Sequence, residues 1–114
     1  MTDKLEYTNK HELIFLDQTL LPLKEKYVKT RNYKDVIEAI KALRIRGAPL
    51  IGIAAAYGVV MAAHHFKSDN PKNFEIHFYK VVESFRSSRP TAKNLFYALD
   101  RMEKVFEENA QKEF

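Results

Sequence analysis

The sequence contains no cysteine and no tryptophan among its 114 residues. The absence of cysteine excludes disulfide bonds, thiol nucleophiles and cysteine-ligated zinc sites within this chain. The first ten residues, MTDKLEYTNK, lack the apolar run that a secretory signal requires. These absences fit a reducing compartment, and we expect a cytoplasmic protein.

Long hydrophobic runs are almost absent as well. The longest stretch without a charged residue, from Gly47 to Ala63, has seventeen residues. This length lies at the lower limit of the ~17–25 residues that a membrane-spanning helix needs. The stretch begins with Gly-Ala-Pro and contains Gly52 and Gly58. We therefore interpret it as a buried core helix, and we expect no membrane contact.

The residues that are present suffice for one globular core. Hydrophobic residues make up 46% of the chain and include eight Phe and six Tyr, so one domain over residues 1–114 is expected. The alternating segments 13–17 and 26–30 predict a small antiparallel β-hairpin. Periodicity and capping residues predict helices at 32–44, 49–66, 71–86 and from Pro90 or Thr91 onward. The predicted fold is mainly α, a hairpin followed by a bundle of about four helices.

Two loops share one construction that suits anion binding. Arg46-Gly47-Ala48-Pro49 leads into the second predicted helix, and Arg89-Pro90-Thr91 leads into the fourth. A helix N-terminus offers free N–H groups and partial positive charge, and arginine adds a planar fork that matches phosphate. The alternative is that both arginines are simply solvated. Arg44 is interpreted as a surface residue, because residues two apart do not share a helical face.

Other polar residues give weaker signals. The four histidines (His11, His64, His65 and His77) have no partner at metal-ligand spacing, and we interpret them as helix-end or surface residues. His11 falls in the N-terminal segment, which we expect to be frayed. Asp17 forms a turn or orients a loop through hydrogen bonds. Because the histidines lack ligand partners, no metal is expected. The glycine-rich patterns that bind nucleotides are also missing, so no cofactor is expected.

A basic stripe raises the question of nucleic acid. Residues 23–46 contain eight Lys or Arg against three acidic residues. Five of these cations are interleaved with two tyrosines, a pattern that can bind single strands: Lys24, Lys26, Tyr27, Lys29, Arg31, Tyr33 and Lys34. Charged hairpin edges also protect ordinary sheets from aggregation. We favour the second interpretation and expect no nucleic-acid partner.

Three segments in order resemble the N-terminal domain of the S-methyl-5-thioribose-1-phosphate isomerase family. They are Leu16-Asp17-Gln18-Thr19-Leu20-Leu21-Pro22, Arg44-Ile45-Arg46-Gly47-Ala48-Pro49-Leu50-Ile51-Gly52-Ile53-Ala54-Ala55-Ala56-Tyr57-Gly58, and Ser88-Arg89-Pro90-Thr91-Ala92-Lys93-Asn94-Leu95. The resemblance covers about residues 12–104. It implies an enzyme of methionine salvage that converts an aldose 1-phosphate to a ketose 1-phosphate, as a homodimer when full-length. It also implies that Arg46, Gly47, Ala48 and Arg89 contact the substrate.

One departure from the family bears on activity. The resemblance places the catalytic Cys and Asp in a C-terminal Rossmann-like domain, and this chain has no Cys. We therefore expect a fragment, the N-terminal substrate-binding domain, which is inactive alone. The alternative is a stand-alone phosphosugar-binding or protein-docking module, related to the regulatory subunits of a translation initiation factor.

Overall fold

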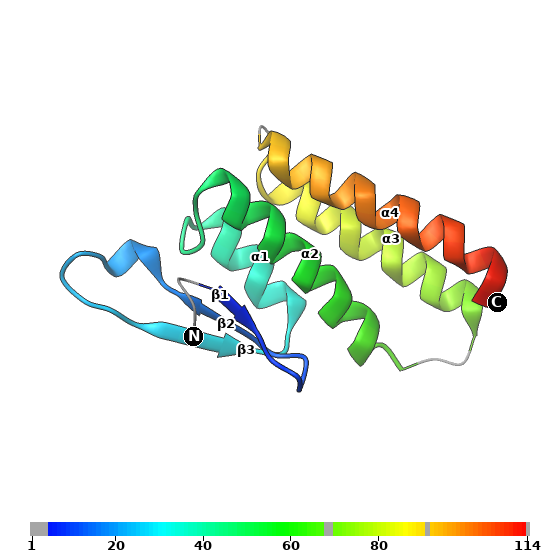
Figure 1. The fold of residues 1–114 in the computed structure, drawn as a ribbon, viewed down its shortest axis with the longest axis horizontal. Helices are drawn as coiled ribbons and strands as arrows, with labels where there is room; N and C mark the ends of the chain where they lie inside the picture. Colours follow the sequence, from blue (N-terminus) through cyan, green and yellow to red (C-terminus); the bar gives the residue numbers. More distant parts are fainter. Residues whose placement is uncertain (1–4, 68–69, 91, 114) are drawn as a thin grey trace.

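The computed structural model of this chain describes residues 5–67, 70–90 and 92–113. Three strands come first, β1 (Leu5–Tyr7), β2 (Leu13–Leu16) and β3 (Tyr27–Thr30), with a 3-10 turn η1 (Gln18–Leu20) after β2. Four helices follow: α1 (Tyr33–Lys41), α2 (Ala48–His65), α3 (Pro71–Ser88) and α4 (Lys93–Glu113). The sheet lies at one end of the molecule, and α3 and α4 extend to the other (Figure 1). The predicted mainly α fold is confirmed.

The sheet is antiparallel, with strand order β1-β2-β3. The predicted hairpin corresponds to β2 and β3, in which Phe15 pairs with Val28. β1 is an additional strand that the sequence did not predict, and its Leu5 pairs with Phe15 from the other side. The Tyr7 ring of β1 stacks on Tyr57 of α2, with ring centroids 4.6 Å apart. A contact distant in sequence therefore holds this short strand in place.

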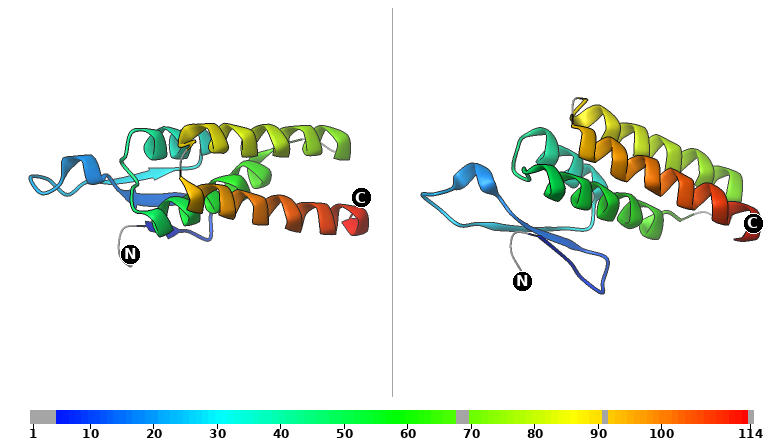
Figure 2. Two further views of the ribbon diagram at one scale, coloured as in Figure 1. Left: turned by 90° about the horizontal axis from the view of Figure 1, so that it is seen from above. Right: turned by 45° about the horizontal axis from the view of Figure 1, so that its top comes forward.

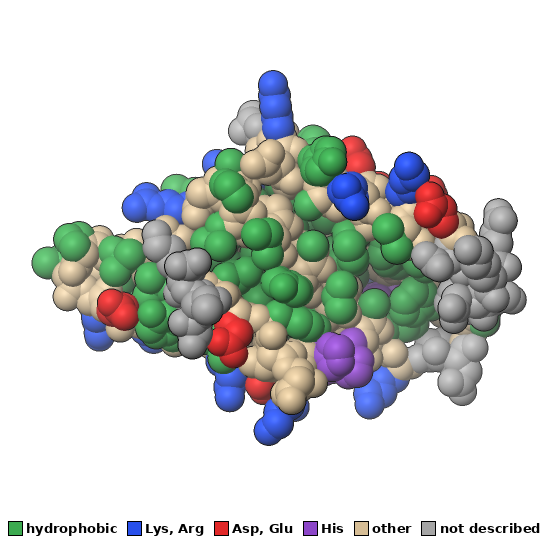
Figure 3. Space-filling model, viewed as in Figure 1, with side chains coloured by type: hydrophobic (Ala, Val, Ile, Leu, Met, Phe, Trp, Pro, Cys, Tyr) green, Lys and Arg blue, Asp and Glu red, His purple; other side chains and the backbone are tan. Residues whose placement is uncertain are grey.

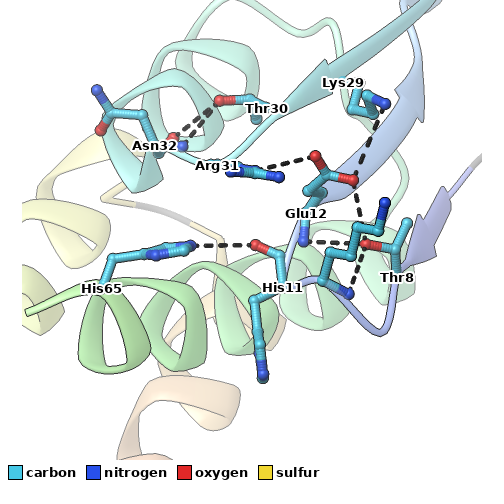
Figure 4. A network of polar contacts seen from close by, with 9 residues as sticks. Thr8, His11, Glu12, Lys29, Thr30, Arg31, Asn32 and His65 are labelled. Atoms are coloured by element: carbon cyan, nitrogen blue, oxygen red, sulfur yellow. Dashed lines mark hydrogen bonds and ion pairs between the residues drawn. The ribbon is translucent and has the colours of Figure 1, made fainter.

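The expectation of a frayed segment around His11 is wrong. His11 lies in the tight turn between β1 and β2 with φ of +59°. Its ring stacks on His64 of α2 at 3.5 Å between centroids. The His11 carbonyl lies 3.4 Å from Nε2 of His65, as Figure 4 shows. The turn is thus fixed against the C-terminal end of α2.

Helix α2 is the central helix of the bundle. It contacts α1, α3, α4 and β1, and Figure 2 shows these elements arranged around it. By length and composition α2 could cross a membrane, but 44% of its residues are buried inside the fold. The contacts with four elements make it the core helix that the sequence predicted, but it is not buried all round, because Ile53, Tyr57 and Val60 on one face are exposed.

Two helices begin where their capping residues predict. Asn32 Oδ1 accepts a hydrogen bond from the Lys34 N–H at 3.0 Å, and Asn70 Oδ1 accepts one from the Lys72 N–H at 2.9 Å. Each side chain satisfies one of the N–H groups that a helix start leaves free.

The predicted start of the fourth helix is wrong by two or three residues. The sequence placed it at Pro90 or Thr91, whereas α4 begins at Lys93. Arg89 caps the C-terminus of α3 with non-helical backbone angles (φ −144°, ψ 81°), and the Ala92 N–H donates to the Arg89 carbonyl at 3.0 Å. Pro90 therefore lies in a turn, and Thr91 lies outside the described residues.

Candidate functional site

Both arginine-bearing loops line one cavity of about 420 Å³. It lies where α2 and α4 begin, at the same end of the bundle (Figure 1). All four residues predicted to contact substrate line this cavity: Arg46, Gly47, Ala48 and Arg89. The remaining lining residues are Leu43, Ile51, Ala92, Lys93 and Asn94. The fold thus brings together two loops that lie far apart in the sequence.

The first loop presents backbone N–H groups to the cavity. Gly47 is the N-terminal cap of α2, with φ of +102°, and no side chain caps this helix. A Cβ on Gly47 would meet nothing within 4 Å, so the glycine is required by its backbone angle. The first hydrogen bond of α2 runs from the Ile51 N–H to the Gly47 carbonyl at 3.0 Å. The N–H groups of Ala48 and Leu50 precede it and have no partner within the helix.

The second loop contributes Arg89, which is partly exposed but has one buried nitrogen. Nη1 of Arg89 is buried and has no hydrogen-bond partner among the described residues. A buried donor without an acceptor is unfavourable, and for a charged group the penalty is larger. The guanidinium at this position would be satisfied by the oxygen of an anion in the cavity.

The connection between α1 and α2 is fixed by its own backbone. Leu43 adopts a positive φ of +65°, which turns the chain out of α1. The N–H groups of Arg44 and Ile45 both donate to the Ala39 carbonyl, at 2.8 and 3.1 Å. The Ile45 side chain is completely buried. Only Arg46 and Gly47 then separate this anchored segment from the first turn of α2.

Arg44 was interpreted as a surface residue, and its side chain is 37% exposed, but it also forms two ion pairs that the sequence did not predict. Its Nη1 donates to Asp17 Oδ2 at 2.9 Å, and its Nε donates to Glu38 Oε1 at 3.1 Å. Asp17 is buried, and burial raises the pKa of its carboxyl. Hydrogen bonds from Thr19 and Arg44 outweigh that effect and hold the Asp17 pKa below its usual value. Asp17 therefore does both things that the sequence offered: its side chain caps the η1 turn and, through Arg44, orients the α1–α2 connection.

The sequence did not single out the role of Gln18, which contacts the same connection twice. Its backbone N–H donates to the Arg44 carbonyl at 2.9 Å. Its side-chain Nε2 donates to the Arg46 carbonyl at 3.2 Å. The residue is 6% exposed, so these bonds are shielded from water. The only available signal was its place in the first of the three family-like segments.

The lining of this cavity is cationic, and it offers few groups for proton transfer. Arg46, Arg89 and Lys93 supply three cationic side chains at its wall, beside the starts of two helices. Lys93 and Asn94 were not predicted as site residues, although both belong to the third family-like segment. Among the described residues that line the cavity there is no carboxylate, imidazole or thiol. The described part of the chain also holds no cluster of three or more metal-ligating side chains.

A larger cavity of about 640 Å³ lies between the sheet and the C-terminal end of α2. Its cations Lys29 and Arg31 are already paired with Glu12, at 3.9 and 3.0 Å (Figure 4). The hydrogen bond from Arg31 lowers the pKa of the Glu12 carboxyl. The charges of these two members of the basic stripe are thus already balanced by Glu12. The smaller cavity, lined by Arg46 and Arg89, is therefore the better candidate for an anion site.

Hydrophobic side chains gather on the face formed by α2 and α4, as the space-filling view shows (Figure 3). A groove of about 330 Å³ on this face is lined mainly by apolar residues, among them Pro49, Ile53, Tyr97 and Met102. Asn94 lines both this groove and the cavity of the two arginine loops, called the anion cavity below. The two depressions are therefore neighbours.

The sequence is similar to one family model and to named sugar-phosphate isomerases. The sequence model of the Initiation factor 2 subunit family matches residues 44–113. Methylthioribose-1-phosphate isomerase of Carboxydothermus hydrogenoformans is 47% identical over 100 residues, which are 88% of this chain and 29% of that protein. The 5-deoxyribose 1-phosphate isomerase of Petrotoga mobilis is 48% identical over 103 residues, 90% of this chain and 30% of that protein.

A solved structure shows the same arrangement. The 5-methylthioribose 1-phosphate isomerase from Pyrococcus horikoshii superimposes with a TM-score of 0.90 and 39% identity. The match covers 94% of this chain and 30% of that one. This chain thus spans about 30% of the length of the curated relatives it matches, in their N-terminal part.

Proposed function

The chain belongs to the initiation factor 2 subunit family, and we propose that it is the N-terminal substrate-binding part of a methylthioribose-1-phosphate isomerase. The observation that carries this proposal is the single cavity shared by the two arginine loops. Its buried Arg89 Nη1 has no partner among the described residues. Arg46 and Arg89 bind phosphate or ribose oxygens, and Gly47 and Ala48 donate backbone N–H groups.

The proposed reaction isomerises an aldose 1-phosphate to a ketose 1-phosphate. A phosphate on C1 blocks ring opening at the anomeric hydroxyl, so the reaction needs a placed acid and a placed base. The described cavity residues supply cations and amides instead. We therefore assign binding and orientation of the phosphate to this chain. The proton-transfer groups are assigned to the part of the relatives that this chain does not match.

The substrate class follows from what the relatives' names share. One relative is named for methylthioribose 1-phosphate and another for 5-deoxyribose 1-phosphate, and the common element is ribose 1-phosphate. We propose that the cavity recognises this common part in a soluble, cytoplasmic protein whose full-length form is a homodimer. The named relatives favour this reading over a stand-alone docking module.

Binding of ribose 1-phosphate to the 114-residue chain, measured by isothermal titration calorimetry, tests the proposal. We expect Arg46→Ala and Arg89→Lys each to weaken binding by at least tenfold. A charge-assisted hydrogen bond contributes about 1.5–3 kcal/mol, and lysine lacks the planar fork of arginine. Arg31→Ala is the matched control, because Arg31 pairs with Glu12 and does not line the anion cavity.

Two outcomes would contradict the proposal. Equal affinity of the wild type and the Arg46 and Arg89 variants would remove both residues from the site. A loss of binding in Arg31→Ala alone would move the anion to the larger cavity.

In the full-length enzyme, Arg46→Ala is expected to raise KM and to lower kcat/KM. The expected decrease in kcat/KM corresponds to a loss of about one to several kcal/mol of transition-state stabilisation.

A further inference from the structure

The Arg46–Gly47 peptide connects the anchored end of the α1–α2 connection to the start of α2. Its carbonyl oxygen accepts a hydrogen bond from Gln18 Nε2 at 3.2 Å. The peptide is trans, and in a trans peptide the N–H points away from the C=O. The Gly47 N–H is therefore directed away from Gln18. Arg46 and Gly47 line the anion cavity, whereas Gln18 does not.

This peptide needs an external partner to keep one orientation. Gly47 has φ of +102°, and a Cβ placed on it would meet nothing within 4 Å. Glycine has more backbone freedom than other residues, so a bond to the preceding carbonyl helps to fix the orientation of this peptide. The preceding N–H groups, of Arg44 and Ile45, are held by the Ala39 carbonyl. The following turn is held by the bond from Ile51 to Gly47. Gln18 is the described side chain that holds the Arg46 carbonyl between these two anchors.

Gln18 is itself held rigidly. Its backbone N–H is bonded to the Arg44 carbonyl, and the residue is 6% exposed. The preceding residue, Asp17, donates its N–H to the Lys26 carbonyl at 2.8 Å and forms an ion pair with Arg44. Asp17 Oδ1 also accepts from the Thr19 N–H at 3.0 Å, which caps η1. The η1 turn is thus attached to both β3 and the α1–α2 connection.

We propose that Gln18 is a positioning residue for the phosphate site. By holding the Arg46 carbonyl, it directs the Gly47 N–H toward the anion and keeps the Arg46 side chain at the cavity wall. This inference rests on the proposed function, because it takes the ligand of the cavity to be a sugar phosphate. It adds a residue outside the cavity that sets the affinity of the groups inside it.

The test combines nuclear magnetic resonance of the Gly47 amide with titration of ribose 1-phosphate. Gln18→Met removes the side-chain donor and leaves the backbone bond to Arg44 in place. We expect the Gly47 amide signal of this variant to broaden or double in the absence of ligand. We also expect about tenfold weaker binding, the effect of one misplaced hydrogen bond to a charged group. Gln18→Leu, which also lacks the donor and adds no charge near the anion, is expected to behave alike if the methionine variant is poorly folded.

The matched control is Glu38→Gln. It removes the other ion-pair partner of Arg44 but does not touch the contact from Gln18 to Arg46. We expect its Gly47 signal and its affinity to equal those of the wild type. A structural effect of disturbing the α1–α2 connection in general would instead appear in this variant as well.

The outcomes separate this inference from the proposed function. If Arg46→Ala loses affinity but both Gln18 variants bind like the wild type, the role of Gln18 is overturned and the phosphate site stands. A changed Gly47 signal without a loss of affinity overturns it too. If the wild-type chain itself binds no ribose 1-phosphate, the proposed function fails, and the positioning role fails with it.

Discussion

Two glycines of α2 are required for different physical reasons. Gly47 has a positive φ of +102°, and a Cβ placed on it would meet open space. Gly58 has an ordinary helical backbone, but a Cβ there would collide with the Phe85 ring. Phe85 is completely buried, so its ring has little room to move. Gly47 allows the positive φ that the loop before α2 requires, and Gly58 leaves room for the Phe85 ring of α3 against α2.

Replacing each glycine by alanine should separate binding from stability. Gly47→Ala is expected to cost about 1–3 kcal/mol through backbone strain and to weaken ribose 1-phosphate binding. Gly58→Ala is expected to cost about 1–3 kcal/mol through overpacking and to leave binding unchanged. Urea unfolding and calorimetry measure the two quantities. Unchanged binding in Gly47→Ala would show that the loop does not need this conformation for its ligand.

At the scale of elements, the helices were predictable because their signals are local. Asn32 and Asn70 cap the helices that they precede, and the apolar stripe of α3 recurs at helical spacing. β1 could not be predicted, because three residues carry no pattern and its support comes from β2 and from Tyr57. The start of α4 was misplaced because Pro90 suits a turn as well as a first helical residue.

Helices α3 and α4 are joined by polar contacts on their outer side. Arg86 of α3 donates to Asp100 of α4 at 2.9 Å and to Glu103 at 2.6 Å. Tyr79 of α3 donates its hydroxyl proton to Glu107 of α4 at 2.6 Å. The hydrogen bond to Glu107 is the main reason why the pKa of Tyr79 is raised to about 12. Alkaline pH is therefore the condition that tests this contact.

A spectroscopic titration of the tyrosines at 295 nm checks the Tyr79–Glu107 contact. The folded-state pKa lies above the usual value, so the contact stabilises below about pH 10 and is lost as the pH rises toward 12. We expect Tyr79→Phe to remove a late step from the titration, and Glu107→Gln to shift that step to lower pH. Tyr97→Phe, at an exposed position, is the control. A late step that persists in Tyr79→Phe would assign it to another tyrosine.

At the scale of the whole molecule, the two loops of the candidate site were predictable from the sequence. The residues that hold the first loop in place were not. The sequence predicted Arg46 and Arg89 as candidate site residues because arginine, glycine and proline before a helix favour anion binding, and the structure places both at one cavity. Gln18 and Asp17 support the first loop through bonds to residues more than twenty positions away. Such pairings have no periodicity in the sequence. The third cation at the cavity, Lys93, is the first residue of α4.

The described titratable groups predict a loss of stability in acid. Burial lowers the pKa of His77 and, together with His11, that of His64. Bonds from Arg31 and from Thr19 lower the pKa of Glu12 and Asp17. Because all four groups have folded-state pKa values below the unfolded ones, the unfolded chain binds more protons as the pH falls. Stability is therefore present at neutral pH and lost on acidification.

Urea midpoints measured between pH 8 and pH 3.5 check this pattern. We expect a constant midpoint above about pH 7.5, a first decrease below about pH 6.5 as histidines of the unfolded chain protonate, and a second below about pH 4.5 from the carboxylates. The double variant His64→Gln, His77→Gln should lack most of the first decrease. A midpoint that stays constant from pH 8 to pH 5 would contradict the role of these histidines.

The unpartnered Nη1 of Arg89 bears on how well the protein resists proteolysis. Nη1 of Arg89, just after α3, is shielded from water and has no hydrogen-bond acceptor among the described residues. Such a donor destabilises its surroundings, and under the proposed function an anion that accepts its hydrogen bond would stabilise this segment against local opening. Because the anion would bind the folded chain and not the unfolded one, it would also raise the free energy of unfolding. Proteases act on opened chains, and the survival time of this protein in a cell would therefore follow the supply of its own ligand.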